Sequence, residues 1–484
     1  MSSPSSAEPS SSLPSTESDA EVRRRDLRQI VWEGSLANIF IVLTGGAFIT
    51  GMALALGASD FEIGLLTALP YLAQSAQLLA PWFGERLGSR KKITLWGLLV
   101  GRQIWWLVIP LLFLGGGWRL SVFLILVALS ALATTAVVPT WLAWVSDIVP
   151  ERIRGRFFGA RNAAIAISTL VSSILGSLAL DWLRAAGREA LGFAVLIGAA
   201  ALAAVLAARS LFLVHDTEPS RALAVRSLGD LIKPLTDRSF RSLLRVFCAW
   251  NFAIGLSAPF FAPQMLINLK MSFFLIGLYS SGTSLIAIAL NRPWGAAIDR
   301  FGSKSVLTLC AAGIGLVPLI WLFPRADFLW LLIFEGIYSG ALWAGFTLAA
   351  FTAPIDESPR RERALYLAWF AVVTGLAFFT ASLIGGLAAE AMAGLALQVG
   401  PQTIVNYHVI FVLSAVLRLA AAGLMVAFKE PAQVGLPVMV QMMGYAVLKR
   451  MPLGRQILSL DANGNGGPGR TKPEQESGPG GLAH

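Results

Sequence analysis

Ionisable side chains inside strongly apolar runs are the residues of this sequence best suited to chemistry. Glu335 lies about nine residues into such a run, roughly 13 Å deep if the run is a helix. A carboxylate at that depth is costly unless it is paired, protonated or hydrated, which makes it a candidate for binding a solute or carrying a proton. The alternative is a structural acid that stays neutral and is hydrogen-bonded to a neighbouring helix.

Other polar side chains in apolar runs could contribute to the same site. Arg102 could pair with Glu335 or bind an anionic group, and a structural or lipid-facing role is an equal alternative. Amides and aromatic rings could supply hydrogen bonds and an apolar wall, although each is more often a contact between helices. These further candidates are Asn38, Asn251, Tyr338 and Trp343.

The sequence offers little for catalysis or for a metal. Cys248 and Cys310 both lie in apolar runs and the three histidines are scattered, so neither a disulfide framework nor a metal site is supported. The Gly-x-Ser-x-Gly elbow of hydrolases and the phosphate-binding Gly-rich loop are both missing from the sequence. We therefore expect no enzyme activity, no cofactor and no bound metal.

The composition indicates that most of the surface faces lipid. Of the 484 residues, 56% are hydrophobic and 14% are charged, whereas soluble domains carry roughly 25% charged residues. The net charge of +10 could suggest a nucleic-acid partner, but the basic residues recur in short loops between apolar runs. That distribution is typical of a membrane protein, so the expected partner is lipid and not nucleic acid.

Apolar runs long enough to cross a bilayer, about 20 residues in a helix, occur in two sets of six. The predicted spans are 33–56, 61–83, 93–115, 119–145, 157–181 and 189–213, then 241–268, 272–297, 304–323, 327–351, 364–390 and 404–428. The predicted fold is therefore an all-α membrane protein with two six-helix bundles.

The same pattern divides the chain into bundles, linker and tails. The bundles cover 25–213 and 241–428, and the polar segment 214–240 links them. Residues 1–24 are Ser- and Pro-rich and are expected to be a disordered tail, and 429–484 form a C-terminal tail. Loops that follow the even-numbered spans hold most of the Lys and Arg, which predicts that the linker and both tails are cytoplasmic, in a membrane of the bacterial inner type.

Two charged motifs each occur twice, in the same order and at similar spacing. Residues 81–92 read PWFGERLGSRKK and residues 295–304 read GAAIDRFGSK, so both give an acid, an Arg, a spacer, Gly, Ser and a base. Later in each half, Asp147 and Asp356 precede a Pro by three positions and an Arg-rich turn follows. The recurrence indicates a duplicated half.

The repeated motif resembles the cytoplasmic loop signature of the major facilitator superfamily. Residues 295–304 match it completely, whereas the first copy departs from it at Pro81 and Glu85. With the twelve spans, the resemblance covers about residues 25–430. It implies a monomer whose halves, related by a pseudo-two-fold axis along the membrane normal, rock about a central site to move a small organic solute.

The resemblance also implies a cytoplasmic gate. Glu85 would face the start of the eleventh span and Asp299 the start of the fifth, where a helix N-terminus attracts an acid. The acid of each second motif would pair with a base of the first motif in the same half. The predicted gate residues are Glu85, Arg86, Arg90, Asp147, Asp299, Arg300, Lys304 and Asp356. The alternative is that these charges serve only topology and turn formation.

The functional expectation is secondary active transport by alternating access, with protons coupled through Glu335 as a hypothesis. A uniporter is the nearest mechanistic alternative. A sensor or assembly factor on the same fold, without transport, is the alternative from a different class.

Overall fold

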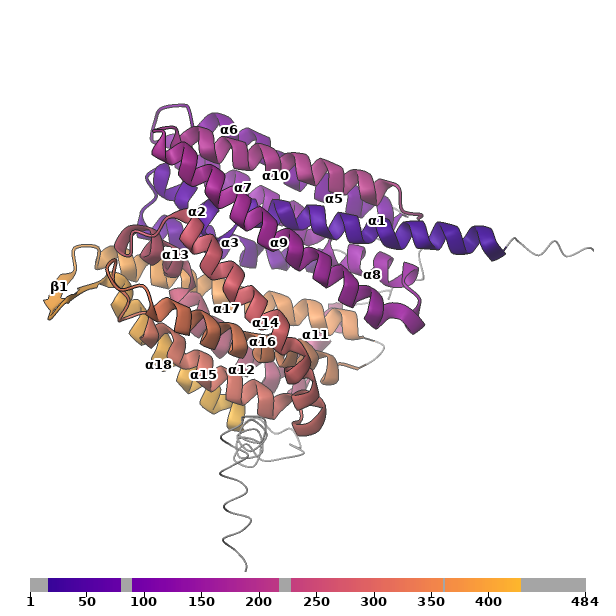
Figure 1. The fold of residues 1–484 in the computed structure, drawn as a ribbon. Coiled ribbons are helices and arrows are strands. Elements are labelled where there is room, and N and C mark those ends of the chain that lie inside the picture. The colour runs from indigo at the N-terminus through magenta and orange to yellow at the C-terminus, as the bar shows by residue number, and fades with distance from the viewer. Residues whose placement is uncertain (1–15, 80–88, 217–227, 360–361, 428–484) are drawn as a thin grey trace, which may run out of the picture. The chain divides into compact units, whose positions relative to one another are not determined.

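Nearly all of the described chain is helical, as expected for a chain that must satisfy its backbone hydrogen bonds inside lipid. The structure is a computed structural model, and it describes residues 16–79, 89–216, 228–359 and 362–427. Figure 1 shows the helices of the first half, coloured indigo to magenta, beside those of the second half, coloured pink to yellow.

The first half begins with a bent span. Its two parts meet at Gly46, whose φ of 53° is a left-handed conformation that favours glycine. The helices of this half are α1 (Thr16–Leu43), α2 (Gly46–Ala55), α3 (Asp60–Ala73), η1 (Gln74–Leu79), α5 (Arg90–Gln103), η2 (Ile104–Leu107), α6 (Val108–Leu111), α7 (Trp118–Ala136), α8 (Val138–Ile148), η3 (Glu151–Ile153), α9 (Arg154–Ala185) and α10 (Glu189–Phe212).

The second half repeats this plan and adds a hairpin before its last helix. Its elements are α11 (Leu228–Thr236), α12 (Arg238–Ser257), η4 (Ala258–Phe260), α13 (Phe261–Pro263), η5 (Gln264–Asn268), α14 (Phe273–Phe301), α15 (Ser303–Ile320), α16 (Leu331–Asp356), α17 (Arg363–Ala391), β1 (Ala396–Val399), β2 (Gln402–Val405) and α18 (Asn406–Ala427). The strands pair antiparallel, with Ala396 opposite Val405.

The predicted spans agree with these helices. Among the described residues, 11 helical segments are long and apolar enough to cross a membrane. The remaining predicted span, 61–83, corresponds to α3 and η1, and its last residues lie outside the described part of the chain.

Several local expectations were wrong. The first helix begins at Thr16, so residues 16–24 are helical and not part of a disordered tail. Hydropathy did not predict this helix start, because the turns at residues 16–24 are polar. The next turn of the same helix is anchored, because the Asp26 carboxylate accepts a hydrogen bond from the His215 N–H at 3.4 Å. The linker contains helix α11, and the segment before α18 contains the β-hairpin, neither of which was expected.

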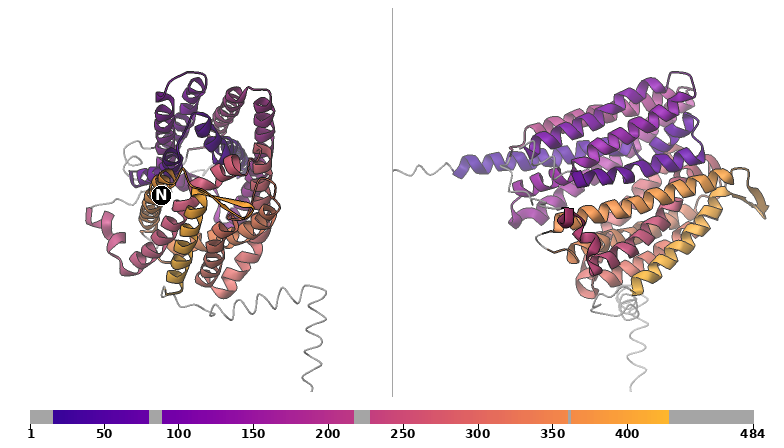
Figure 2. Two further views of the ribbon diagram at one scale, coloured as in Figure 1. Left: turned by 90° about the vertical axis from the view of Figure 1, so that its left-hand side faces the viewer. Right: turned by 180° about the vertical axis from the view of Figure 1, so that it is seen from behind.

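Two helix pairs, α3 with α17 and α9 with α14, provide most of the contact between the two halves. Glycines allow the close approach: Gly64 of α3 lies against the backbone of Ser382 and Gly386, and Gly277 of α14 lies against Ser173 and Ser177. Both views in Figure 2 keep the halves side by side.

We call one end of the helices the loop end and the other the opposite end. The loop end carries the start of α5 and the junction of α14 with α15, where the repeated motifs lie. The opposite end carries the start of α3, the start of α14 and the β-hairpin. In Figure 1 the opposite end is on the left.

The Gly64 contact predicts a large stability difference between two glycine substitutions. A Cβ at Gly64 would lie 2.7 Å from the Ser382 carbonyl oxygen, whereas a Cβ at Gly423 of α18 would have no atom within 4 Å. We expect Gly64→Ala to cost about 1–3 kcal/mol through overpacking and to lower the Tm of the purified protein. Gly423→Ala is the control and should leave the Tm unchanged or slightly raised; equal Tm values for the two variants would contradict the close contact.

Candidate functional site

A pocket lined mostly by aromatic rings lies where three helices of the second half meet α3 of the first. Its volume is about 260 Å³. Helices α12, α16 and α17 supply most of the wall, and Tyr71 of α3 completes it. The lining residues are Tyr71, Phe247, Trp250, Asn251, Ile254, Trp343, Phe346, Ala350, Phe370, Thr374 and Phe378.

Ring contacts fix the shape of this aromatic pocket. Tyr71 stacks on Phe378 with a centroid distance of 3.6 Å and an interplanar angle of 17°. Trp343 meets the edge of Phe346 at 5.6 Å, and Phe346 also lies 4.8 Å from Trp250. Because the stacked pair joins α3 to α17, a movement of one half against the other changes the pocket wall.

Few polar groups reach the aromatic pocket, and none of the lining residues is charged. Asn251 donates one amide hydrogen to the Phe247 carbonyl at 2.8 Å, which leaves its side-chain oxygen and its second hydrogen for a ligand. Thr374 is turned back onto its own helix, since its hydroxyl donates to the Phe370 carbonyl at 2.6 Å. In the described chain the Tyr71 hydroxyl has no hydrogen-bond partner, so it too can bond a ligand.

This arrangement suits an uncharged solute with a flat or apolar face. Aromatic rings provide large apolar contact area with defined geometry, and a small number of polar groups then fixes the orientation of the ligand. Among the described residues, no group of His, Cys, Asp and Glu could hold a metal ion.

The structure brings two of the predicted site residues together and places the others elsewhere. Asn251 and Trp343 line the aromatic pocket. Asn38 donates to the Thr169 hydroxyl at 2.6 Å, a contact between α1 and α9. The Tyr338 hydroxyl donates to the Gly313 carbonyl at 3.0 Å and so faces α15.

Glu335 lies inside the second half, outside the aromatic pocket. Its side chain is buried, with 1% of the residue exposed, and the Tyr279 hydroxyl of α14 donates to its carboxyl group. No basic residue forms an ion pair with it in the described chain. The contact fits the structural alternative stated above, a neutral acid that bonds a neighbouring helix, and it leaves proton transfer as a prediction.

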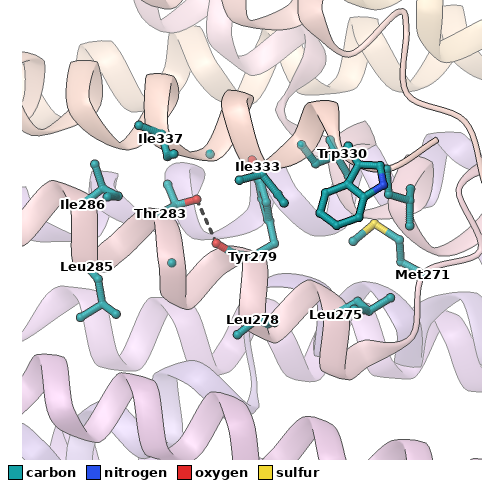
Figure 3. A pocket seen from close by; sticks show the side chains of 14 residues that line it. Met271, Leu275, Leu278, Tyr279, Thr283, Leu285, Ile286, Trp330, Ile333 and Ile337 are labelled. Atoms are coloured by element: carbon teal, nitrogen blue, oxygen red, sulfur yellow. Dashed lines mark hydrogen bonds between the residues drawn. The ribbon is translucent and has the colours of Figure 1, made fainter.

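Tyr279 also belongs to the wall of an apolar groove between α14 and α16. The groove measures about 570 Å³, and Figure 3 shows Leu275, Leu278 and Leu285 along one side, with Ile333 and Ile337 along the other. Many of these side chains are exposed; Ile333 is 56% exposed and Leu285 52%. Apolar side chains exposed along a membrane helix are expected to face lipid.

A buried ion pair in the first half was not anticipated. Glu33 of α1 and Arg161 of α9 are 3.5 Å apart, with side chains 4% and 14% exposed. The Arg161 guanidinium also lies over the Trp141 ring at 4.9 Å. Arg102 is 8% exposed and lies near the Phe40 ring, so it is buried within the first half and does not pair with Glu335.

The sequence profile of a known family matches almost the whole helical part of the chain. The profile described as Major Facilitator Superfamily matches residues 34–266 and 246–442. The chain belongs to this superfamily. No curated protein matches the chain individually.

Solved structures of superfamily transporters share the fold at low sequence identity. A variant of the nucleoside transporter NupG is 14% identical, with a TM-score of 0.64 over 84% of this chain and 100% of that one. A D-xylose–proton symporter is 15% identical, with a TM-score of 0.62 over 84% of this chain and 99% of its own. A bacterial homologue of the human lysosomal transporter Spinster gives a TM-score of 0.57 at 15% identity, over 87% of this chain and 100% of that one.

The predicted gate residues of this superfamily member are only partly described. Glu85 and Arg86 lie outside the described residues. Arg90 and Asp147 form an ion pair with Nη1 and Oδ2 2.5 Å apart, one of the pairings expected between the two motifs of the first half.

The gate of the second half can be followed at Asp299, Arg300 and Asp356. Asp299 and Arg300 are exposed, and Arg300 lies beside the Phe301 ring. In the described chain Asp356 makes no ion pair with Arg300, and Asp299 makes no hydrogen bond to the start of α9. Lys304 lies in the first turn of α15. The gate therefore stays a prediction.

Most of the aromatic pocket was missed by reasoning from single polar residues, although the sequence carries a signal for it. Aromatic or polar residues recur at helical spacing at 247, 250 and 251 in α12, at 343 and 346 in α16, and at 370, 374 and 378 in α17. Each series places its members on one helix face. Three such faces in one half would have indicated a shared pocket.

The buried ion pair predicts a non-additive effect on stability. Glu33→Gln removes the only carboxylate bonded to Arg161 in the described chain, and breaking a buried pair from one side costs about 3–5 kcal/mol. Glu33→Gln and Arg161→Gln should therefore each lower the Tm of the purified protein strongly. The double variant should show a smaller fall in Tm than the sum of the falls in the two single variants. A fall equal to that sum would show that the pair contributes nothing as a pair.

Proposed function

We propose that this superfamily transporter is a secondary transporter that carries an uncharged small organic solute by alternating access. The aromatic pocket is its substrate site. The observation that carries the proposal is the composition of that pocket, which has seven aromatic rings, one free amide group and no charged side chain, at a junction between the two halves.

Burial along α14 supports a two-state movement of the halves. Gly277, Ser281, Ser284 and Ile288 follow one another along one helix face at spacings of three and four residues. Gly277 and Ser281, nearer the opposite end, are buried, with Gly277 against Ser173 and Ser177 of the other half, whereas Ser284 and Ile288, farther along the helix, are exposed. This gradient is what halves joined at the opposite end and separated at the loop end would produce.

The solved neighbours support the substrate class. A nucleoside and D-xylose, the solutes named for two of them, are both neutral ring compounds. A neutral ring can stack on or lie against aromatic side chains without the desolvation cost of a charge. The chain is expected to act as a monomer, with both termini in the cytoplasm of a bacterial inner membrane.

The pocket assignment is tested by ligand-induced stabilisation. Purified protein is screened by thermal shift against nucleosides, pentoses, organic acids and organic cations, and we expect a neutral ring compound to raise the Tm. Asn251→Ala and Trp343→Ala should each raise the Kd of that compound about tenfold, because a hydrogen bond or a ring contact is worth about 1–1.5 kcal/mol.

Trp118→Ala is the matched control, since Trp118 is 50% exposed at the start of α7. Selection of an acid or a cation would contradict the substrate class. A transport assay in proteoliposomes with the selected compound then separates a transporter from a sensor on the same fold, which would bind without flux.

Proton coupling through Glu335 is tested in the same proteoliposomes. If Glu335 carries the proton, Glu335→Gln abolishes accumulation driven by a pH gradient while leaving exchange of labelled for unlabelled solute intact. If accumulation persists in the variant, another group carries the proton. If the unaltered protein shows no accumulation at all, it is a uniporter and Glu335 is structural.

A further inference from the structure

We propose that Asp181 and Glu390 are positioning residues that hold the two halves together at the opposite end. Each is a carboxylate from one half that caps the N-terminus of a helix in the other half. This inference rests on the alternating-access function proposed above, and it assigns the contacts that must form and break in each cycle.

The first contact joins α9 to α14. The Phe273 N–H donates to Asp181 Oδ1 at 3.0 Å and the Phe274 N–H donates to Asp181 Oδ2 at 2.7 Å. These are the first two amides of α14, which have no acceptor within their own helix. The next amide, Leu275 N–H, donates to the Ser272 hydroxyl at 3.2 Å, so the α14 terminus is satisfied only with a carboxylate from the other half.

The second contact joins α17 to α3 in the same way. Glu390 Oε2 accepts hydrogen bonds from the Ser59 hydroxyl at 3.0 Å and from the Phe61 N–H at 3.1 Å. Ser59 is itself the N-cap of α3, with Glu62 completing a capping box. The α3 terminus therefore also uses a carboxylate from the other half.

The two contacts are equivalent in the duplicated plan. Helices α9 and α17 are the fifth spans of their halves, and α3 and α14 belong to the second spans. Asp181 and Glu390 each lie 27 residues after the first residue of their helix, Arg154 and Arg363. Both capped helices begin after a serine, Ser59 or Ser272. An accidental surface contact has no reason to recur at equivalent positions.

Among the described residues, α9 and α17 have no such contact at the loop end. The N-termini of α9 and α17 lie there, and neither has a side-chain cap in the described structure. The carboxylate contacts at the opposite end therefore belong to one of the two states. Opening that end exposes the amides of α3 and α14 to water, and the free-energy cost is the loss of charged hydrogen bonds that also interact favourably with the helix dipole.

Further hydrogen bonds between the halves reinforce the second contact, whereas the first has ring contacts of Phe273 with Phe48 and Phe193. Asp60 at the start of α3 accepts hydrogen bonds from the Asn406 amide at 2.7 Å and the Tyr407 hydroxyl at 2.6 Å. These bonds join α3 to α18, across the halves. The equivalent first residue of α14 is Phe273, which cannot accept them. We expect the α9–α14 contact to yield first, so Asp181 variants should show the larger effect.

Site-directed thiol labelling tests the proposal without a substrate. In a chain with Cys248→Ala and Cys310→Ala, a reporter Ser177→Cys lies one turn from Asp181, at a position that is fully buried. A second reporter, Asn291→Cys, continues the helix face of Gly277, Ser281, Ser284 and Ile288 and lies at an exposed position in the loop-end part of α14. A soluble maleimide is added to protein in nanodiscs, where both membrane faces are accessible, and the labelling rate is measured.

With Asp181→Asn we expect the Ser177→Cys reporter to label about tenfold faster, because a hydrogen bond to a charged group is worth about 1.5 kcal/mol or more. The Asn291→Cys reporter should label more slowly, since opening one end closes the other. Asp181→Glu should restore part of the original rate. Glu390→Gln should change both rates in the same directions by a smaller factor.

Glu189→Gln is the matched control. Glu189 is an acid at the same end, and its ion pair with Arg184 at 3.4 Å stays within one half, so both labelling rates should be unchanged. Faster labelling of both reporters in Asp181→Asn would indicate general loosening and would overturn the proposal, as would unchanged rates. If the two labelling rates change in opposite directions but no solute flux is detected, the proposed contacts are supported and the proposed transport function is contradicted.

Discussion

The need to satisfy every backbone N–H and C=O inside lipid governs this structure. A helix interior meets the need by itself, but the first amides and last carbonyls of each helix do not. In a membrane protein these unsatisfied groups are confined to the two ends of the helices. A carboxylate from another helix therefore stabilises the structure most when it binds at a helix end. At these ends, two halves can also be joined or separated without disturbing the apolar packing between them.

Buried charges in the spans follow the same logic. Glu33 is bonded to Arg161, and Glu335 receives the Tyr279 hydroxyl. Arg418, which is 2% exposed, donates to the Ser257 hydroxyl at 2.9 Å. Each of these contacts lies within one half, so a movement between the halves leaves it intact. The aromatic pocket differs, because Tyr71 and Phe378 meet across the halves, and this makes the pocket sensitive to the state of the protein.

The sequence predicted the spans because hydropathy depends only on composition and length. It predicted the duplication because the two motifs are local. It did not predict the start of α1, where the first turns are polar, nor the aromatic pocket, which depends on how three helices rotate about their axes. The sequence placed Glu335 deep in an apolar run, but the direction of its side chain could not be predicted. A side chain at a given depth can face the central site or its own bundle. For Glu335, packing against Tyr279 determines which of the two it faces.

A duplicated fold can readily have two states of similar free energy. Each pair of facing helices, α3 with α17 and α9 with α14, has a carboxylate of one helix bound to the N-terminus of the other at the opposite end. In the proposed cycle, contacts at one end break as contacts at the other end form, so the equilibrium between the two states depends on the difference in free energy between the two sets of contacts. That difference need be only about 1 kcal/mol for both states to be populated. The copies are not identical: Glu85 replaces an acid that is Asp in the second copy, and Asp60 has no counterpart in α14. Because of these differences, we expect the two helix pairs to differ in strength and to separate one after the other.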